Sequence, residues 1–171
     1  AEKVVDLLAE PEVWMIDETS FPKAGAASVG VARQYCGALG KVANCQVAVI
    51  LHWSTCEASC PLAWRLYLPQ SWLATPARRA EGKIPEAILY RSKNQLAMEL
   101  VDQALTWDVP RLPVVADSAY GNDFDFRAGL RERGLQYAVA VEPSVKVWIS
   151  DPAQVPVAAS KPTGRPRQYP A

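Results

Sequence analysis

The stretch VWMIDETS, residues 13–20, decides the fold of this chain, because a short apolar run passes directly into acidic and hydroxylated residues. Consecutive apolar side chains with β-branched residues at both ends predict a buried strand over residues 13–16. Asp17 then stands at the carboxyl end of that strand. The same arrangement recurs 100 positions later, where a strand predicted over residues 112–116 is followed by Asp117.

Three further strands are expected around these two. Residues 45–53 are almost continuously apolar, which is typical of a central strand buried on both faces. Residues 62–68 alternate weakly up to Pro69 and are expected to pair with it in the antiparallel sense. Residues 21–44 contain several glycines and no sustained period, so a long loop or an irregular hairpin is expected there. A strand over residues 137–141 comes last.

Two helices are predicted in the second half of the chain. Ser92 and Gln95 form a capping-box pattern in front of an apolar stripe at helical spacing. Asn122 or Asp123 can begin a second helix, which ends at Gly134. Three early strands followed by helix–strand alternation predict an α/β fold, a mixed sheet with helices on its faces. In such a sheet the first and fourth predicted strands can be parallel neighbours.

If those strands are neighbours, Asp17 and Asp117 come together at one place on the sheet. Two adjacent carboxylates repel each other unless a cation lies between them. Mg²⁺ prefers such hard oxygen ligands, and a pair of these ions suits phosphodiester chemistry. The alternative is that each aspartate caps a loop or helix at the end of its strand, which is a common arrangement.

Several blocks of this sequence resemble the catalytic domain of DDE-type insertion-sequence transposases. The blocks follow one another in order from about residue 11 to about residue 142, which makes the resemblance specific. They are VWMIDETSFPK (13–23), SVGVARQYCG (28–37), NCQVAV (44–49), LAWRLYLP (62–69) and VADSAYG (115–121).

The resemblance implies an RNase H-like core that cuts and rejoins DNA with Mg²⁺, or Mn²⁺ in its place. Asp17 and Asp117 would be the first two acids of the catalytic triad, both catalytic and metal-binding. The third acid, a glutamate on a later helix, is expected beyond the basic segment that begins near Lys161, so none is assigned here. The fold is then expected to be incomplete at the C-terminus and the fragment alone inactive. Glu18 stands where a second aspartate is more usual, and we expect it outside the metal shell.

Basic residues that follow the first and third predicted strands are candidates for contact with phosphates. An ordinary solvated surface is the alternative for each. The DNA-binding candidates are Lys23, Arg33, Lys41, Arg78, Arg79 and Lys93, with Lys83 and Arg91 beside them and Tyr120 as a base-stacking aromatic ring. For Tyr120 a packing role in the core or in a loop is the favoured alternative.

Composition sets limits on the class of protein. The 171 residues are 50% hydrophobic and carry 18 basic and 18 acidic side chains, so no overall charge indicates nucleic acid. Residues 21–100 nevertheless have a net charge of +5, counted from the sequence. The four cysteines are too few for a disulfide scaffold. No apolar run is long enough to span a membrane, so a cytoplasmic protein associated with the nucleoid is expected.

Domain boundaries follow from these patterns. Residues 1–10 are expected to end a preceding helical region, residues 11–142 to form the N-terminal part of the catalytic core, and residues 143–171 to be an irregular, basic, proline-rich linker. His52 is expected to be a hydrogen-bonded core histidine. Cys56 and Cys60 have a permissible spacing for zinc, but such a site is disfavoured. The other candidate ligands, Cys45 and His52, share one strand and point to different faces or lie out of reach.

The expected partners are DNA, at the element ends and the target, and a second copy of the full-length protein. Two rival functions stay open. One is an RNase H-like nuclease that hydrolyses DNA without strand transfer. The other is a truncated, non-catalytic remnant that binds DNA or regulates the intact enzyme.

Overall fold

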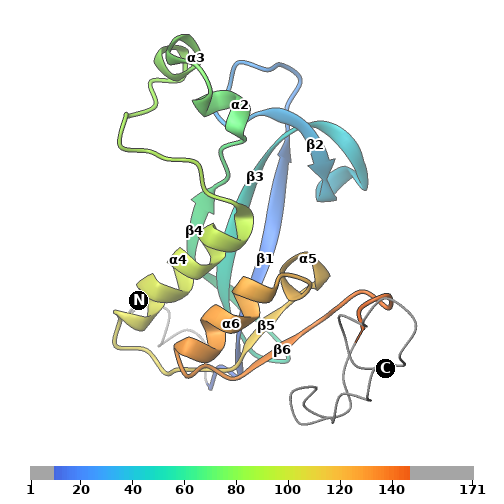
Figure 1. Ribbon diagram of the computed structural model, residues 1–171. Coiled ribbons are helices and arrows are strands. Elements are labelled where there is room, and N and C mark those ends of the chain that lie inside the picture. Colours follow the sequence, from blue (N-terminus) through green and yellow to red (C-terminus); the bar gives the residue numbers. More distant parts are fainter. Residues whose placement is uncertain (1–9, 147–171) are drawn as a thin grey trace, which may run out of the picture. The chain divides into compact units, whose positions relative to one another are not determined.

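The strand that carries Asp17 lies in the middle of a six-stranded mixed sheet (Figure 1). The computed structural model describes residues 10–146. In chain order the elements are β1 (Val13–Pro22), β2 (Ala32–Cys36), the 3₁₀ helix η1 (Gly37–Leu39), β3 (Lys41–Ser54), β4 (Ser59–Leu66), α2 (Gln70–Leu73), α3 (Pro76–Glu81), α4 (Lys93–Leu105), β5 (Val114–Ala116), α5 (Ser118–Gly121), α6 (Phe124–Glu132) and β6 (Tyr137–Val139).

The strand order is β2-β3-β1-β5-β6, and β4 also pairs with β3. β1 is antiparallel to β3 and pairs over its own whole length with residues 45–54 of β3. The other edge of β3 is shared end to end, with β2 on residues 41–45 and β4 on residues 48–54. β5 and β6 continue the sheet as parallel strands on the far side of β1.

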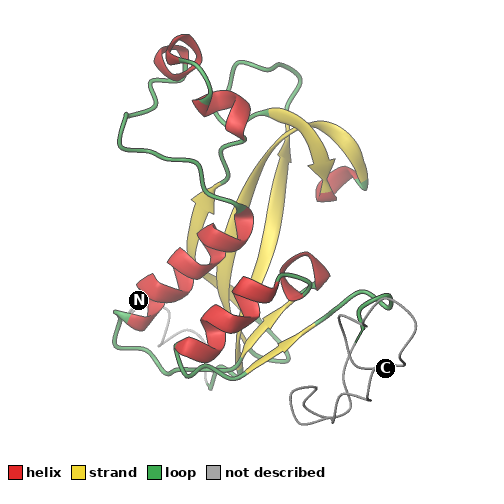
Figure 2. Ribbon diagram, viewed as in Figure 1, coloured by secondary structure: helices red, strands yellow, loops and turns green. Residues whose placement is uncertain are grey.

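Helices α4 and α6 cover one face of the sheet, as Figure 2 shows in red against yellow strands. Alternate residues of each strand face them, because side chains along a strand point to opposite sides. Trp14 and Ile16 of β1 are buried there beside Leu51 and Trp53 of β3. From α4 the same core receives a stripe of Leu96, Ala97, Leu100, Val101 and Ala104.

The predicted helix starts are confirmed. Ser92 accepts a hydrogen bond from Gln95 N at 3.2 Å, and the Gln95 side chain accepts one from Ser92 N at 2.9 Å. Asp123, one of the two predicted caps, accepts from Phe126 N at 2.7 Å and begins α6. Gly134 follows that helix with a φ of +67°, a conformation that favours glycine.

The mixed α/β sheet predicted from the sequence is confirmed, and its topology is that of an RNase H-like fold. The structure adds three details to the prediction. β1 does not end at Ile16 but continues to Pro22, because β3 supplies backbone partners along that whole length. The segment from 21 to 44 is the irregular hairpin of the two alternatives, with β2 and η1 inside it. The polar segment 70–91 contains the short helices α2 and α3.

The chain divides into one unit that ends at Val141 and another that begins at Glu142. Of the second unit, residues 142–146 are described, and they form a turn in which Val145 N donates to Glu142 O at 3.0 Å. The predicted helical end over residues 1–9 and the linker beyond residue 146 lie outside the described residues. Within residues 10–146, no helix has both the length and the apolar character needed to cross a membrane.

Candidate functional site

Asp17 and Asp117 occupy matching positions on neighbouring strands. β1 and β5 are parallel, and Ile16 pairs with Ala116. Asp17 follows this pair within β1, and Asp117 follows it directly after the end of β5. Neighbouring strands are about 4.8 Å apart in the hydrogen-bonding direction. Ile16 packs in the core with Val114, so by alternation both aspartates face the opposite side of the sheet, away from α4 and α6. The structure therefore brings the two acids together.

Both carboxylates are exposed, and backbone N–H groups hold each of them. Asp17 Oδ1 accepts a hydrogen bond from Glu18 N at 2.7 Å. Asp117 Oδ1 accepts one from Ala119 N at 2.9 Å, because Asp117 is the N-cap of α5. Capping and closeness to Asp17 are thus compatible at this residue. One oxygen of each side chain is used to set its orientation.

Glu18 points to the other face of the sheet from Asp17. Its Oε2 forms an ion pair with Lys93 Nζ at 2.5 Å, and its Oε1 accepts a hydrogen bond from Tyr120 OH at 3.3 Å. Lys93 is the first residue of α4, so Glu18 lies beneath the start of that helix. This position agrees with the expectation that Glu18 stays outside a metal shell formed by its neighbour.

Tyr120 does not fit the role of a base-stacking ring, and the packing role that the sequence favoured is the one observed. Its side chain is 1% exposed and packs against Phe126 at 5.5 Å between ring centroids. A buried ring has no face available to a base. Burial raises the pKa of the Tyr120 hydroxyl, and the charges of Glu18, Asp117 and Asp17 raise it further. Tyr120 is therefore a protonated donor close to three carboxylates.

His52 lies on the same face of the sheet as Asp17. It pairs with Met15, two residues before Asp17 on β1. Its Nδ1 is 3.0 Å from Ser59 Oγ, which in turn is 3.0 Å from Ser54 Oγ. Burial lowers the pKa of the His52 imidazole, and the negative charge of Asp17 opposes part of that shift. The expected hydrogen-bonded histidine is confirmed, although it is half-buried on this face and not in the main core.

The donor set of the acid pair suits a divalent metal but is incomplete. Carboxylate oxygens on neighbouring strands are the ligand type that Mg²⁺ and Mn²⁺ take. Across residues 10–146, no three His, Cys, Asp or Glu side chains converge as a metal site. The four cysteines are free thiols in this structure. Asp17 and Asp117 could thus hold an ion only together with ligands from outside the described residues, or with water.

Two of the predicted DNA contacts extend the face that carries the aspartates. Lys23 N donates to Asn44 O at 2.9 Å, and Arg33 pairs with Asn44 on the other side of β3. Residues in one row of a sheet share a face, and alternation along β1 from Asp17 leads to Lys23 on the same side. Both cations are exposed. Lys41 is also exposed but alternates to the opposite side of β3.

The other predicted cations are engaged in intramolecular contacts. Arg78 pairs with Glu81 at 2.6 Å and lies 3.6 Å from the centroid of the Trp72 ring. Arg79 donates to the carbonyl oxygens of Leu73, Pro85 and Ile88 at 3.3, 3.1 and 2.8 Å. Lys93 is held by Glu18, as described above. These contacts stabilise the connection between β4 and α4, and contact with DNA stays a prediction for each of the three.

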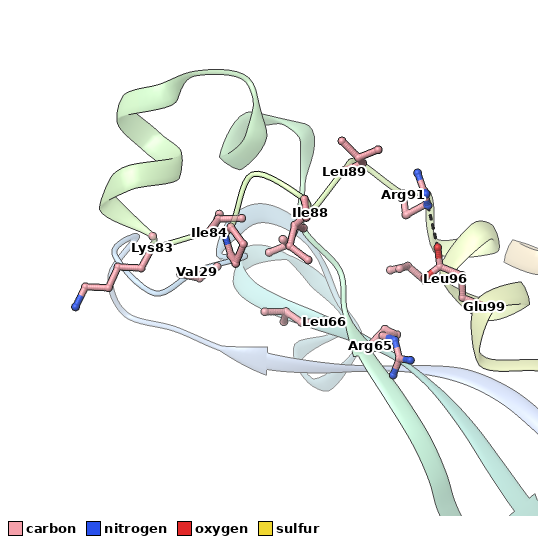
Figure 3. Close-up of a pocket in the computed structure, with 14 residues that line it drawn as sticks. Val29, Arg65, Leu66, Lys83, Ile84, Ile88, Leu89, Arg91, Leu96 and Glu99 are labelled. Atoms are coloured by element: carbon pink, nitrogen blue, oxygen red, sulfur yellow. Dashed lines mark hydrogen bonds and ion pairs between the residues drawn. The ribbon is translucent and has the colours of Figure 1, made fainter. Parts of the chain in front are cut away.

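A separate cavity of about 440 Å³ lies between β4 and the segment that precedes α4 (Figure 3). Leu66, Ile84, Ile88 and other apolar side chains line it, and Lys83 and Arg91 are among its lining residues. Arg91 forms an ion pair with Glu99 at 2.8 Å, drawn as a dashed line in Figure 3. Neither aspartate of the acid pair lines this cavity, so it is a different feature of the surface.

Sequence reasoning missed the aromatic side chains exposed on the face of the acid pair. Trp64 is 61% exposed and pairs with Ile50, which pairs with Asp17, so one row across the sheet joins them. Tyr35 is 64% exposed beside Val42 on the curled hairpin. In the sequence each of them is only an aromatic residue at a solvent-facing strand position. Such a position does not show whether the exposed ring belongs to a binding face.

The sequence of the chain also matches a known family. A family model described as "DDE superfamily endonuclease" matches residues 1–171. The chain belongs to this family. A probable transposase for insertion sequence element IS701 from Microchaete diplosiphon is 34% identical to this DDE endonuclease chain over 136 residues. That alignment covers 79% of the chain and 33% of the relative, so the chain spans about a third of the relative's length. No solved structure gives a significant match.

Proposed function

We propose that this chain is the N-terminal part of the catalytic core of an insertion-sequence transposase, with Asp17 and Asp117 as metal-binding catalytic residues. The observation that carries the proposal is the parallel register of β1 and β5, with Ile16 opposite Ala116 and an aspartate directly after each of them. The family and the transposase relative support DNA as the substrate. The complete protein would cleave the element ends and join them to target DNA.

The two aspartates would hold Mg²⁺, or Mn²⁺ in its place. A divalent ion held there supplies Lewis-acid stabilisation of the scissile phosphate and lowers the pKa of a water molecule that acts as nucleophile. The chain's own contribution is to hold two carboxylates on adjacent strands, each orientated by a backbone N–H group. A third acidic ligand is expected from a segment outside residues 10–146, and the chain alone is expected not to cut DNA.

The exposed cations would bind DNA phosphates at some distance from the scissile bond. Lys23 and Arg33 lie on the face of the acid pair, about 20 Å along the strand from Asp17 at ~3.4 Å per residue. Lys41, Arg78, Arg79 and Lys93 are the further candidates, at the positions described above. We also propose self-association of the full-length protein, since two element ends must be joined, and a cytoplasmic location on nucleoid DNA.

Asparagine variants of the full-length protein test this function. Asp17→Asn and Asp117→Asn are nearly isosteric but remove the charge that binds the ion. Each is expected to abolish Mg²⁺-dependent cleavage of an element-end duplex. Asp108→Asn, at an exposed loop position after α4, is the matched control and is expected to cut at the parental rate.

Analysis of the products separates the rival functions. Joined products support a transposase, and hydrolysed ends without joining support a nuclease. DNA binding without any cleavage by the full-length protein supports a regulatory remnant. If both asparagine variants cut DNA as the parent does, the aspartates are ordinary strand-end residues and the proposal is wrong.

A further inference from the structure

Three side chains join the two acid-bearing elements on the helix-covered face of the sheet. Glu18 directly follows Asp17 on β1, Tyr120 lies three residues after Asp117 in α5, and Lys93 begins α4. Glu18 Oε1 accepts from Tyr120 OH at 3.3 Å, and Glu18 Oε2 pairs with Lys93 Nζ at 2.5 Å. We call these three residues the Glu18 clamp. The clamp and the acid pair lie on opposite faces of the sheet.

The clamp is held in a restricted environment. Tyr120 is 1% exposed, and the side chains of Glu18 and Lys93 are 24% and 33% exposed. A carboxylate in such surroundings is stable only when its oxygens have partners, and charged hydrogen bonds of this kind are stronger than neutral ones. Lys93 also lies 5.6 Å from the centroid of the Tyr67 ring. The positions of all three side chains are therefore well defined.

The clamp can control the acid pair through the backbone. Consecutive residues on an extended strand point to opposite faces, so a fixed Glu18 side chain fixes the rotation of β1 at Asp17. On the other strand, Asp117 is the N-cap of α5, and Tyr120 anchors α5 to the core through its ring and its hydroxyl. The bond between Tyr120 and Glu18 thus ties the backbone beside one aspartate to the backbone beside the other.

We propose that Glu18, Tyr120 and Lys93 are positioning residues that hold Asp17 and Asp117 at the separation needed for a shared divalent ion, a role that rests on the proposed function. They do not touch the ion. Burial and the neighbouring carboxylates keep the Tyr120 hydroxyl protonated, so the hydrogen bond persists over the physiological pH range. Loss of an outer group that hydrogen-bonds a metal ligand typically weakens metal affinity by roughly 10–100-fold. The clamp acts through the backbone, so we expect an effect at the lower end of that range.

The test is direct Mn²⁺ binding to the full-length protein, measured by calorimetry without DNA. Tyr120→Phe removes only the hydroxyl and keeps the ring packed in the core. We expect this variant to bind Mn²⁺ at least about tenfold more weakly. Tyr137→Phe is the matched control. It removes a hydroxyl on β6 that accepts a hydrogen bond from Arg131 of α6 and contacts neither Glu18 nor Lys93, so this variant should bind Mn²⁺ as the parent does.

Lys93→Met distinguishes positioning from simple electrostatics. Removal of a cation near the acid pair should tighten Mn²⁺ binding if only charge matters. If the clamp positions the aspartates, the unpaired Glu18 shifts and binding weakens. Weaker binding by Lys93→Met supports the clamp, and tighter binding overturns it. This variant also decides the question if Tyr120→Phe fails to fold.

Failure of the clamp and failure of the proposed function give different results. Asp17→Asn is measured beside the other variants. If it loses Mn²⁺ binding while Tyr120→Phe binds as the parent does, the clamp is wrong and the acid pair stands. If Asp17→Asn binds Mn²⁺ as tightly as the parent, the proposed function itself is wrong.

Discussion

Replacement of Gly121 by alanine should displace the element that carries Tyr120. Gly121 is the last residue of α5, and a Cβ atom there would lie 1.8 Å from Ala140 O and 2.9 Å from Ala140 C. Both are backbone atoms of the segment that follows β6, so rotation of a side chain cannot relieve the overlap. Ordinary contact begins near 3.4 Å. The two backbone segments must therefore separate by about 1.5 Å in a close-packed region.

The expected cost lies at the upper end of the usual range for overpacking, about 3 kcal/mol. For a domain of this size, that free energy corresponds to a fall in Tm of about 6–12 °C. Thermal unfolding followed by circular dichroism measures it. Since Asp117 begins α5 and Tyr120 lies within it, DNA cleavage by the full-length protein should fall as well, even at temperatures where the variant is folded.

Gly25→Ala is the matched control, because a Cβ atom at Gly25 would meet nothing within 4 Å. It should change Tm by no more than about 1–2 °C, the usual effect of a surface substitution. A Gly121→Ala protein with the Tm and the cleavage rate of the parent would refute the reasoning. It would show that α5 and the segment after β6 do not approach as closely as described.

Other variants address the acid pair, the pH response, the DNA face and the loop before α4. Asp17→Asn should leave Tm without metal unchanged or raise it, because a like-charge repulsion is removed, and should reduce the rise in Tm on addition of Mg²⁺. Because the pKa of His52 is lowered in the folded protein, the unfolded chain binds more protons below pH 6.5. The contribution of His52 to stability is therefore complete above pH 6.5 and falls as the pH drops towards the folded-state pKa. For His52→Gln, the free energy of unfolding measured with urea should depend less on pH between pH 5 and 7. Lys23→Gln and Arg33→Gln should each reduce the slope of log affinity against log salt by about one, measured by fluorescence anisotropy with an element-end duplex; an unchanged slope would mean no phosphate contact. Arg79→Met leaves three backbone carbonyls without their donor and should destabilise the protein by about 1–3 kcal/mol, with faster proteolysis between β4 and α4.

The placement of the acid pair followed from local sequence signals. Two apolar runs that each end in aspartate, together with helix–strand alternation after Ser92, allow these strands to be parallel neighbours, and β1 and β5 are such neighbours. The capping box at Ser92 was equally local, since its two hydrogen bonds lie within four residues. Features of this kind can be predicted from the sequence because the residues that bond to each other lie close together along the chain.

The continuation of β1 through Glu18 and Ser20 could not be predicted in the same way. A charged residue on the core side of a strand argues against burial unless a partner is known, and the partners of Glu18 lie 75 and 102 residues away. Polar groups that pair over a long sequence separation leave no periodic pattern in the residues around them, so such pairs cannot be predicted from local sequence.

The parallel pairing of β1 with β5 has a consequence for synthesis on the ribosome. β3 can occupy one edge of β1 early, but the partner for the other edge is formed by residues 114–116. At a usual rate of about 5–20 residues per second, the roughly 100 intervening residues take about 5–20 s to emerge. During that time the open edge of β1 is exposed to other nascent chains, and an exposed edge is a template for wrong pairing. Ribosomes that pause between β1 and β5 would therefore lower the yield of correctly folded protein without any change in its sequence.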